Sequence, residues 1–296
     1  MSPRRAAPAS SVQAPDAAEM RQLAEVFRQE AGLVFADDSG FVLERRLRER
    51  VAALGLPSFA HYVDYLRYDP GGARELEEAL ELVTTHETYF FREEYQLRAF
   101  RDEVVPRLRQ LAGARRRLSV WSAGCATGEE AYTVAMLLAH GALPPGWQAR
   151  VLGSDLSRRC VAAARRAVYG PAAFRCVPFE FRQQYFAETA EGTAVSPPIR
   201  AMCSFVQLNL LDRDRLAVVG RVDAIFCRNV LIYLDQEARR RVLDNVYECL
   251  LPGGFLMLGH SESLLHVPSG FEPVRLRDDL VYRKPEGAQA RRGGAP

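Results

Sequence analysis

Val120-Trp-Ser-Ala-Gly-Cys-Ala-Thr-Gly-Glu-Glu130 is the most informative stretch of this chain of 296 residues. An apolar segment ending at Trp121 runs into a turn of small residues with Gly124 and Gly128, and a helix with an apolar face follows at once. This order of strand, glycine turn and helix is typical of nucleotide-type cofactor sites, because glycine lets the backbone approach a ligand closely. We therefore predict an α/β fold and place Gly124 among the cofactor-binding residues.

The turn does not match the fingerprint of a dinucleotide site. Gly124 and Gly128 are four positions apart and no third glycine follows, so a nicotinamide-dependent dehydrogenase is the weakest alternative. The acidic pair Glu129 and Glu130 stands where a pyrophosphate would need bare N–H groups and the positive end of a helix dipole. A cofactor without phosphate fits better, and we infer S-adenosylmethionine.

Composition limits the class of protein. A net charge of +2 argues against nucleic acid as the main partner. No apolar run reaches the roughly 20 residues of a membrane span, and residues 1–16 lack the apolar core of a secretory signal. The six cysteines are scattered, without the close pairs of a zinc site or the density of a disulfide scaffold. We expect a cytoplasmic protein with reduced thiols, no bound metal and no membrane insertion.

The pattern along the chain predicts two domains. Residues 17–84 carry helical apolar stripes, such as the one that includes Leu43, Leu47 and Val51, and predict a small all-helical domain. Residues 85–284 alternate strands and helices, which predicts a mostly parallel sheet with right-handed crossovers. Residues 171–206 interrupt that alternation and indicate a small inserted β-subdomain, such as a short hairpin. The ends, 1–16 and 285–296, predict disordered tails.

The expected elements of the second domain follow from the same pattern. A long helix from about Glu93 to Leu111 leads into it. The expected strands are Arg117–Ser122, Ala149–Ser154, Val222–Cys227 and Gly254–Gly259, and a hairpin of Glu272–Leu276 and Leu280–Arg283 closes the domain. The expected helices are Glu129–His140, Ser157–Ala167 and Gln236–Leu250.

Polar side chains stand at the ends of these strands, where ligands bind in open α/β sheets. Asp155 can accept hydrogen bonds from both ribose hydroxyls, although it can also cap the helix that starts near Ser157. Asn209 can offer its amide to an adenine edge, or simply form a turn. Asn229 can orient the cofactor, and Tyr233 can hydrogen-bond the methyl acceptor, unless it is a core aromatic.

Two arginine-bearing segments have open interpretations. Thr84–Arg92 mixes hydroxyls and aromatics between the two domains, and Arg92 can pair with a substrate carboxylate, the alternative being a surface arginine. Arg45, Arg46 and Arg50 lie on the outer face of an expected helix. They form either a solvated face or a dock for an acidic helix.

Six segments together resemble the CheR family of chemotaxis receptor methyltransferases, and the resemblance covers about residues 20–284. The segments are Thr84–Arg92, Trp121–Ser122 with Thr127–Glu130, Gly153–Asp155, Leu208–Asp212, Phe226–Tyr233 and Gly259–Glu262. Several such segments in order are more specific than one glycine turn. The resemblance implies an all-helical N-terminal domain followed by a Rossmann-like class I S-adenosylmethionine-dependent methyltransferase domain with a small inserted β-subdomain.

The resemblance also implies an activity, which is methyl transfer from S-adenosylmethionine to glutamate side chains of chemoreceptor cytoplasmic helices, leaving S-adenosylhomocysteine. The residues implied to contact the cofactor are Thr88, Arg92, Glu129, Asp155, Asn209, Leu210, Arg228 and Asn229. Arg92 and Tyr233 are implied to be catalytic and to lie near the transferred methyl group. Some family members carry Asn where this chain has His86, which we include in the predicted cofactor site.

The implied partner is the acidic helical region of a chemoreceptor, and we expect the protein to act as a monomer. One alternative is an S-adenosylmethionine methyltransferase with another acceptor. The sequence lacks the Asn/Asp-Pro-Pro-aromatic motif of amino-group methylation. A second alternative is a non-catalytic homologue that binds S-adenosylmethionine or S-adenosylhomocysteine in signalling.

Overall fold

The computed structural model describes residues 12–36, 39–265 and 267–287. These residues form two compact units. The first contains the described residues up to Thr85 together with Tyr233–Asp235, and the second contains His86–Ile232 and the described residues from Gln236 onward. The predicted boundary after residue 84 differs from this division by one residue and by the short segment 233–235.

Most of the two predicted disordered tails lies outside the described residues. Where the N-terminal tail is described, it is attached to the first unit rather than free. Val12 is buried and its carbonyl accepts a hydrogen bond from Arg48. Asp16 caps the first helix, because its side chain accepts from the backbone N–H groups of Ala18 and Glu19.

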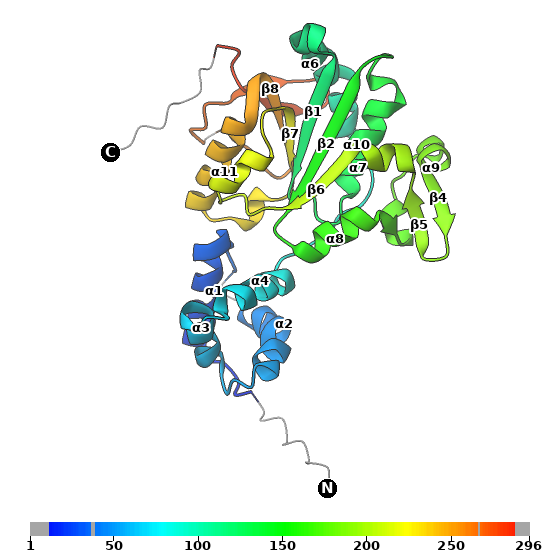
Figure 1. Cartoon of the computed structure of the whole chain (residues 1–296). Helices are drawn as coiled ribbons and strands as arrows, with labels where there is room; N and C mark the ends of the chain where they lie inside the picture. The colour runs from blue at the N-terminus through cyan, green and yellow to red at the C-terminus, as the bar shows by residue number, and fades with distance from the viewer. Residues whose placement is uncertain (1–11, 37–38, 266, 288–296) are drawn as a thin grey trace. The chain divides into compact units, whose positions relative to one another are not determined.

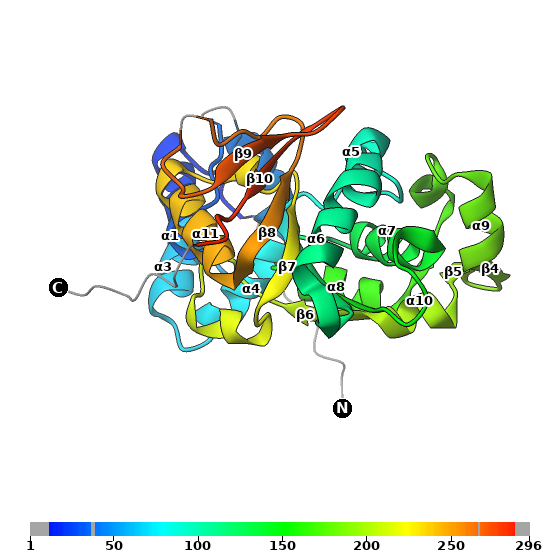
Figure 2. The same ribbon diagram turned by 90° about the horizontal axis from the view of Figure 1, so that it is seen from above.

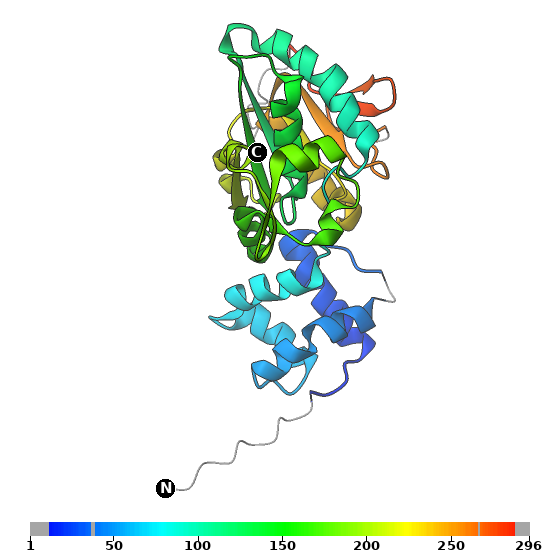
Figure 3. The ribbon, with the colours of Figure 1, turned by 90° about the vertical axis from the view of Figure 1, so that its right-hand side faces the viewer.

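The first unit is helical, as the apolar stripes predicted (Figure 3). Its helices are α1 (Ala17–Ala31), α2 (Gly40–Ala53), α3 (Phe59–Tyr68) and α4 (Gly72–Val83). The predicted apolar stripe of α2 is buried, since Leu43, Leu47 and Val51 are each at most 2% exposed. These side chains face the other helices, because an amphipathic helix is stabilised mainly by packing its apolar face.

A buried carboxylate links three helices of this unit. Glu75 on α4 is 4% exposed, and its carboxylate accepts hydrogen bonds from Arg50 on α2 and from the hydroxyl of Tyr62 on α3 (2.8 Å). Burial, together with the neighbouring Glu75, raises the pKa of Tyr62 well above its ordinary value. The hydroxyl therefore stays protonated and serves as a donor to the carboxylate.

The second unit is built on a mostly parallel sheet (Figure 1). Its strands are β1 (Arg117–Ala123), β2 (Gln148–Asp155), β6 (Cys203–Gln207), β7 (Val222–Cys227), β8 (Leu250–Leu258), β9 (Glu272–Arg275) and β10 (Leu280–Arg283). They lie in the order β6-β2-β1-β7-β8-β10-β9. β10 is antiparallel to both of its neighbours, whereas β6, β2, β1, β7 and β8 are parallel.

The strand order reverses between β1 and β7, because the chain moves outward from β1 through β2 to β6 and then returns to the other side of β1. In open α/β sheets a ligand binds outside the carboxyl ends of the strands at such a switch point. The helices α6 (Val105–Ala112) and α7 (Glu129–Leu137) cover one face of the sheet, and α11 (Gln236–Cys249) covers the other (Figures 1 and 2).

The predicted long helix from Glu93 is interrupted. It consists of α5 (Glu94–Ala99), one π-helical turn at Phe100–Val104, and α6. Pro106 explains the interruption, because proline has no N–H for the carbonyl four residues earlier and its ring crowds that carbonyl. The strand predicted from Gly254 is β8, and it begins four residues earlier, at Leu250.

The inserted subdomain is larger than the predicted hairpin. Its strands β3 (Val168–Tyr169), β4 (Phe186–Thr189) and β5 (Gly192–Val195) form a second, antiparallel sheet in the order β3-β5-β4. It also carries α9 (Phe179–Tyr185) and α10 (Pro197–Met202), and α8 (Arg158–Arg166) precedes it. The strand β3 lies before residue 171, outside the predicted bounds of the insert. The sequence did not predict it, because two residues are too few to produce a recognisable period.

Among the described residues, no helix combines the length and the apolar character that crossing a membrane requires.

Replacing Glu75 by alanine should destabilise the first unit. The change leaves the guanidinium of Arg50 and the buried hydroxyl of Tyr62 without their acceptor, and we expect a loss of about 2–3 kcal/mol in unfolding free energy. Urea denaturation followed by circular dichroism measures this loss. The matched control is Glu49→Ala on the exposed face of α2, which should change the unfolding free energy by less than about 0.5 kcal/mol. Equal effects of the two substitutions would contradict the assignment.

Candidate active site

The turn after β1 is held against the end of β2. The backbone N–H groups of Gly124 and Cys125 both donate to the carbonyl of Ser154, at 2.8 and 2.9 Å. Gly128 has φ +95° and Gly124 has φ +75°, the left-handed region that favours glycine. A Cβ at Gly128 would lie 2.7 Å from that of Ala164, so this glycine also permits close packing against α8.

A Cβ at Gly124 would lie 2.4 Å from the side chain of Val230, in the loop after β7. The glycine is therefore required where the turns after β1 and β7 approach each other, at the switch point of the sheet. The predicted contact between Gly124 and the cofactor stays a prediction.

Asp155 ends β2 and its carboxylate faces the same turn. Its two oxygens accept hydrogen bonds from the backbone N–H groups of Ala126 (2.8 Å) and Ser157 (2.9 Å). The side chain that caps α8 is Ser157, which accepts from the N–H of Cys160 at 3.0 Å, so the alternative of Asp155 as that cap is not needed. The carboxylate is fixed in orientation by the backbone on both sides, as a ribose acceptor would require.

The structure brings two predicted cofactor residues together here. The side-chain atoms of His86, Asp155 and Cys160 that could coordinate a metal ion lie within 4.8 Å of one another. These residue types can also hold a metal ion, but His86 and Asp155 are the side chains that we predict to face the cofactor. We therefore retain the cofactor interpretation and the expectation of no bound metal.

Glu129 and Glu130 begin α7; Glu129 is buried and Glu130 is half-buried, and their carboxylates have different hydrogen-bond partners. Glu129 is 4% exposed and accepts a hydrogen bond from the hydroxyl of Thr127 at 2.6 Å. Burial raises the pKa of both carboxyl groups. Glu130 accepts from Ser122 at 2.7 Å and pairs with Arg228 at 3.1 Å, so it supports the site from within the protein. The sequence analysis identified Glu130 only as part of the acidic pair with Glu129 and did not predict its pairing with Arg228.

Arg228 follows β7, and its guanidinium donates hydrogen bonds to other groups of the protein. The side chain is 2% exposed. It donates to Gln96 (2.8 Å), Glu130 (3.1 Å), Glu93 (3.0 Å) and the carbonyl of Arg92 (2.8 Å). A guanidinium so engaged positions the segment that contains Arg92. The cofactor contact of Arg228 stays a prediction. The four hydrogen bonds show that its side chain holds neighbouring segments of the protein together.

The segment His86–Glu93, which we call the strap, carries three predicted cofactor residues, His86, Thr88 and Arg92. Its Phe91 and Glu93 have φ of +61° and +57°, which is uncommon for residues with side chains and indicates a tightly determined path. The backbone N–H of Phe91 donates to Thr133 on α7 at 3.2 Å. The strap is thus tied to the helix that begins with Glu129.

The strap is also anchored on the inserted subdomain. The Phe90 ring contacts the rings of Tyr169, Phe174 and Phe186, with centroids 4.9, 5.4 and 4.9 Å away, and its N–H donates to the carbonyl of Ala173. These edge and tilted contacts add to the burial of the aromatic surface. The side chain of Arg92 is 30% exposed. Its guanidinium donates to the carbonyl of Glu87 at 3.2 Å.

The remaining predicted cofactor residues follow β6 and β7. The side-chain oxygen of Asn209 accepts from the N–H of Leu211 at 3.0 Å, which forms the turn that was the alternative interpretation. The carbonyl of Leu210 accepts from Asn245 on α11. Asn229 has φ +58° directly after Arg228. Tyr233 is 39% exposed and belongs to the first unit, where its carbonyl accepts from Val34 at 2.9 Å.

The predicted docking arginines have different surroundings. Arg46 donates to the carbonyls of Leu82 and Val83 at the end of α4, and Arg50 pairs with Glu75. Both guanidinium groups are thus bound inside the first unit. Arg45 is exposed and lies over the ring of Phe41 at 6.0 Å. Docking by Arg45, Arg46 and Arg50 stays a prediction, and Arg45 is the exposed residue of the three.

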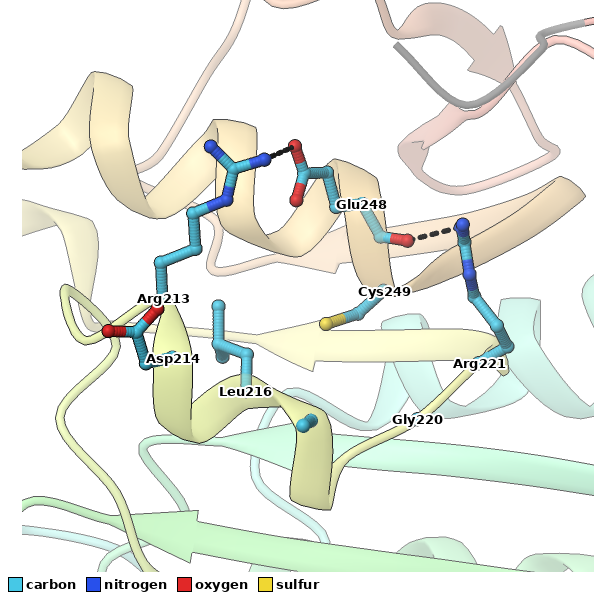
Figure 4. A pocket seen from close by; sticks show the side chains of 8 residues that line it. Arg213, Asp214, Leu216, Gly220, Arg221, Glu248 and Cys249 are labelled. Atoms are coloured by element: carbon cyan, nitrogen blue, oxygen red, sulfur yellow. Dashed lines mark hydrogen bonds and ion pairs between the residues drawn. The ribbon is translucent and has the colours of Figure 1, made fainter. Parts of the chain in front are cut away.

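A cavity of about 460 Å³ lies elsewhere, beside the 3₁₀ helix Asp214–Val218 and the end of α11 (Figure 4). Its rim includes the ion pair of Arg213 and Glu248 at 2.6 Å, and its lining includes Cys249. Burial raises the pKa of the Cys249 thiol to about 11, so the thiol is protonated at neutral pH. The lining contains none of the predicted cofactor residues.

Comparison with known proteins places the whole arrangement in a family. Residues 18–84 match the model of the CheR methyltransferase all-alpha domain, and residues 86–279 match that of the CheR methyltransferase SAM binding domain. The chain is 34% identical to chemotaxis protein methyltransferase 2 of Vibrio cholerae over 88% of this chain and 91% of that protein. It is 34% identical to chemotaxis protein methyltransferase 1 of Pseudomonas aeruginosa over 88% of this chain and 96% of that protein.

A further relative is named for another process. The chain is 36% identical to the probable biofilm formation methyltransferase WspC of Pseudomonas putida over 91% of this chain and 62% of that protein. The chain belongs to the CheR methyltransferase family. It is an S-adenosylmethionine-dependent methyltransferase with an all-helical N-terminal domain and a Rossmann-like catalytic domain.

The raised pKa of Glu129 gives a pH prediction for cofactor binding. Glu129 is ionised only above its raised pKa, so its ability to accept hydrogen bonds from the cofactor is lost on acidification at a higher pH than for an exposed glutamate. Calorimetry should show the dissociation constant of S-adenosylhomocysteine increasing by up to about tenfold for each pH unit below that pKa. Glu129→Gln should bind more weakly at neutral pH and lose most of this pH dependence. An unchanged pH profile in Glu129→Gln would refute the role of this carboxylate.

Proposed function

We propose that this enzyme transfers the methyl group of S-adenosylmethionine to glutamate carboxylates on cytoplasmic helices of chemoreceptors, for adaptation in chemotaxis-type signalling. The observation that carries the proposal is the likeness to chemotaxis protein methyltransferases across both domains and nearly the full length of those proteins. The expected products are glutamate methyl esters and S-adenosylhomocysteine. The enzyme would act in the cytoplasm as a monomer.

The chemistry of the donor set supports this cofactor. Asp155 and Glu129 present carboxylates beside a glycine turn, which suits ribose hydroxyls and disfavours a pyrophosphate. Bound S-adenosylmethionine would supply a methyl group on a positively charged sulfur. The other members of the predicted binding set lie in the glycine turn, on the strap and after β6 and β7; they are Gly124, His86, Thr88, Arg92, Asn209, Leu210, Arg228 and Asn229.

The reaction places modest demands on the protein side chains. A glutamate is ionised at neutral pH and attacks a sulfonium methyl group without a general base. The enzyme must align the carboxylate with the methyl group and exclude water. We assign Arg92 to the charge of the substrate carboxylate and Tyr233 to a hydrogen bond with the same group. Each methylation removes one negative charge from the receptor helix.

The likeness to a biofilm formation methyltransferase favours a second candidate. In this candidate the same reaction modifies a receptor-like protein whose pathway controls an output other than motility. The acceptor chemistry is the same, so the site residues keep their roles. Assays with receptor fragments from the two kinds of pathway separate the candidates.

Radiolabelled S-adenosylmethionine and a chemoreceptor cytoplasmic fragment test the reaction directly. We expect label on the receptor that mild alkali releases as volatile methanol, because a carboxyl methyl ester is hydrolysed under those conditions. A receptor fragment with its glutamates replaced by alanine is the control and should remain unlabelled. Alkali-stable label would indicate another acceptor, and cofactor binding without transfer would favour the non-catalytic alternative.

Replacement of Tyr233 by phenylalanine tests its catalytic assignment. The change removes one hydrogen bond to the acceptor, so we expect turnover to fall about three- to tenfold while the dissociation constant of S-adenosylhomocysteine is unchanged. The control is Tyr68→Phe, an exposed tyrosine on α3 that should have no effect. Complete loss of cofactor binding in Tyr233→Phe would contradict the role.

A further inference from the structure

The carboxylate of Glu262 accepts hydrogen bonds from four backbone N–H groups. One oxygen accepts from Asn229 (2.8 Å) and Gly259 (2.8 Å), and the other accepts from Val230 (2.9 Å) and Ile232 (3.3 Å). Three of these donors belong to the loop after β7. The carboxylate therefore organises a loop whose residues are 30 to 33 positions away in the sequence.

A turn from Gly259 to Glu262 holds this carboxylate in place. Glu262 closes a turn in which its own N–H donates to the carbonyl of Gly259 at 2.9 Å. A Cβ at Gly259 would lie 2.8 Å from the side-chain nitrogen of Asn229, 2.9 Å from its backbone nitrogen and 3.0 Å from the carboxylate. Glycine is therefore required here, because any side chain would separate the turn from the loop.

The loop that Glu262 holds has an unusual backbone and carries residues with assigned roles. Asn229 has φ +58°, a left-handed backbone conformation that asparagine adopts more readily than most other residues with a side chain. Asn229 is in the predicted cofactor set, and Tyr233 directly follows the last clamped residue, Ile232. A carboxylate suits this task because it only accepts hydrogen bonds and offers about four lone-pair sites.

We propose that Glu262 is a positioning residue that fixes the loop Asn229–Ile232, and with it the cofactor contact of Asn229 and the path of the chain into Tyr233. The proposal rests on the roles given above to Asn229 and Tyr233. Glu262 acts through the backbone of the loop and does not itself contact the reacting groups.

The substitution Glu262→Gln tests the clamp, because it replaces one acceptor oxygen by an NH₂ group that opposes the backbone N–H donors. Hydrogen exchange of the full-length protein, measured by mass spectrometry, should increase about tenfold or more in peptides covering residues 229–232 and stay unchanged in β1. The matched control is Glu237→Gln, an exposed glutamate at the start of α11, which should leave both regions unchanged. Unchanged exchange at 229–232, or an equal increase in β1, would overturn the proposal.

Two functional measurements accompany the exchange experiment. In Glu262→Gln the dissociation constant of S-adenosylhomocysteine should increase about five- to twentyfold, and kcat should fall about 10- to 100-fold, as expected from displaced groups in an active site. Glu262→Asp keeps the charge but is one methylene shorter, so it should give intermediate values for both quantities. If Glu262→Gln does not fold, the aspartate variant carries the same test. Values for Glu262→Asp equal to those of the unmodified enzyme would overturn the proposal.

A double substitution separates this proposal from the proposed function. If Glu262 acts on cofactor binding through Asn229, then Glu262→Gln together with Asn229→Ala should weaken S-adenosylhomocysteine binding no more than the worse single substitution. Additive losses would overturn the proposal. Hydrogen exchange and cofactor binding need no receptor, so a failure of receptor methylation in the unmodified enzyme leaves both tests valid.

Discussion

The architecture of the site depends on the buried guanidinium of Arg228. A buried charge is tolerated only when it is paired and hydrogen-bonded, and removal of one partner leaves an uncompensated charge. Arg228 meets this condition through Gln96, Glu130, Glu93 and a backbone carbonyl of the strap. Its position at the end of β7 therefore determines where α5, α7 and the strap come together around the switch point of the sheet.

Two consecutive residues, Arg228 and Asn229, fix the loop after β7 in different ways. The side chain of Arg228 binds acidic and carbonyl groups on one side, while the backbone N–H of Asn229 binds the carboxylate of Glu262 on the other. Opposite charges thus fix consecutive positions of one loop from two directions. The carboxylates predicted to face the cofactor, Glu129 and Asp155, accept hydrogen bonds from neutral donors, the hydroxyl of Thr127 and the backbone N–H of Ala126. In the proposed function their remaining lone pairs accept from the ribose hydroxyls.

Sequence periodicity predicted the helices of the first unit and the strands β1, β2 and β7 within a few residues, because burial on one face imposes a regular spacing on apolar side chains. It could not predict the partners of charged side chains. Arg46 and Arg50 flank the apolar stripe of α2 and are half-buried, and they bind the end of α4 and the buried Glu75. Whether an outward arginine meets solvent or another helix depends on packing that the helix itself does not encode.

The sequence by itself determined the alternation of strands and helices, the glycine turn after β1 and the polar residues at strand ends, since each is a local pattern of a few residues. Only the tertiary structure decided that Arg228 would meet groups 98 to 136 positions away, and that Glu262 would clamp the loop after β7. Such pairings form when crossovers bring the carboxyl ends of distant strands to one edge of the sheet. Local propensity contains no information about which buried charges will then be neighbours.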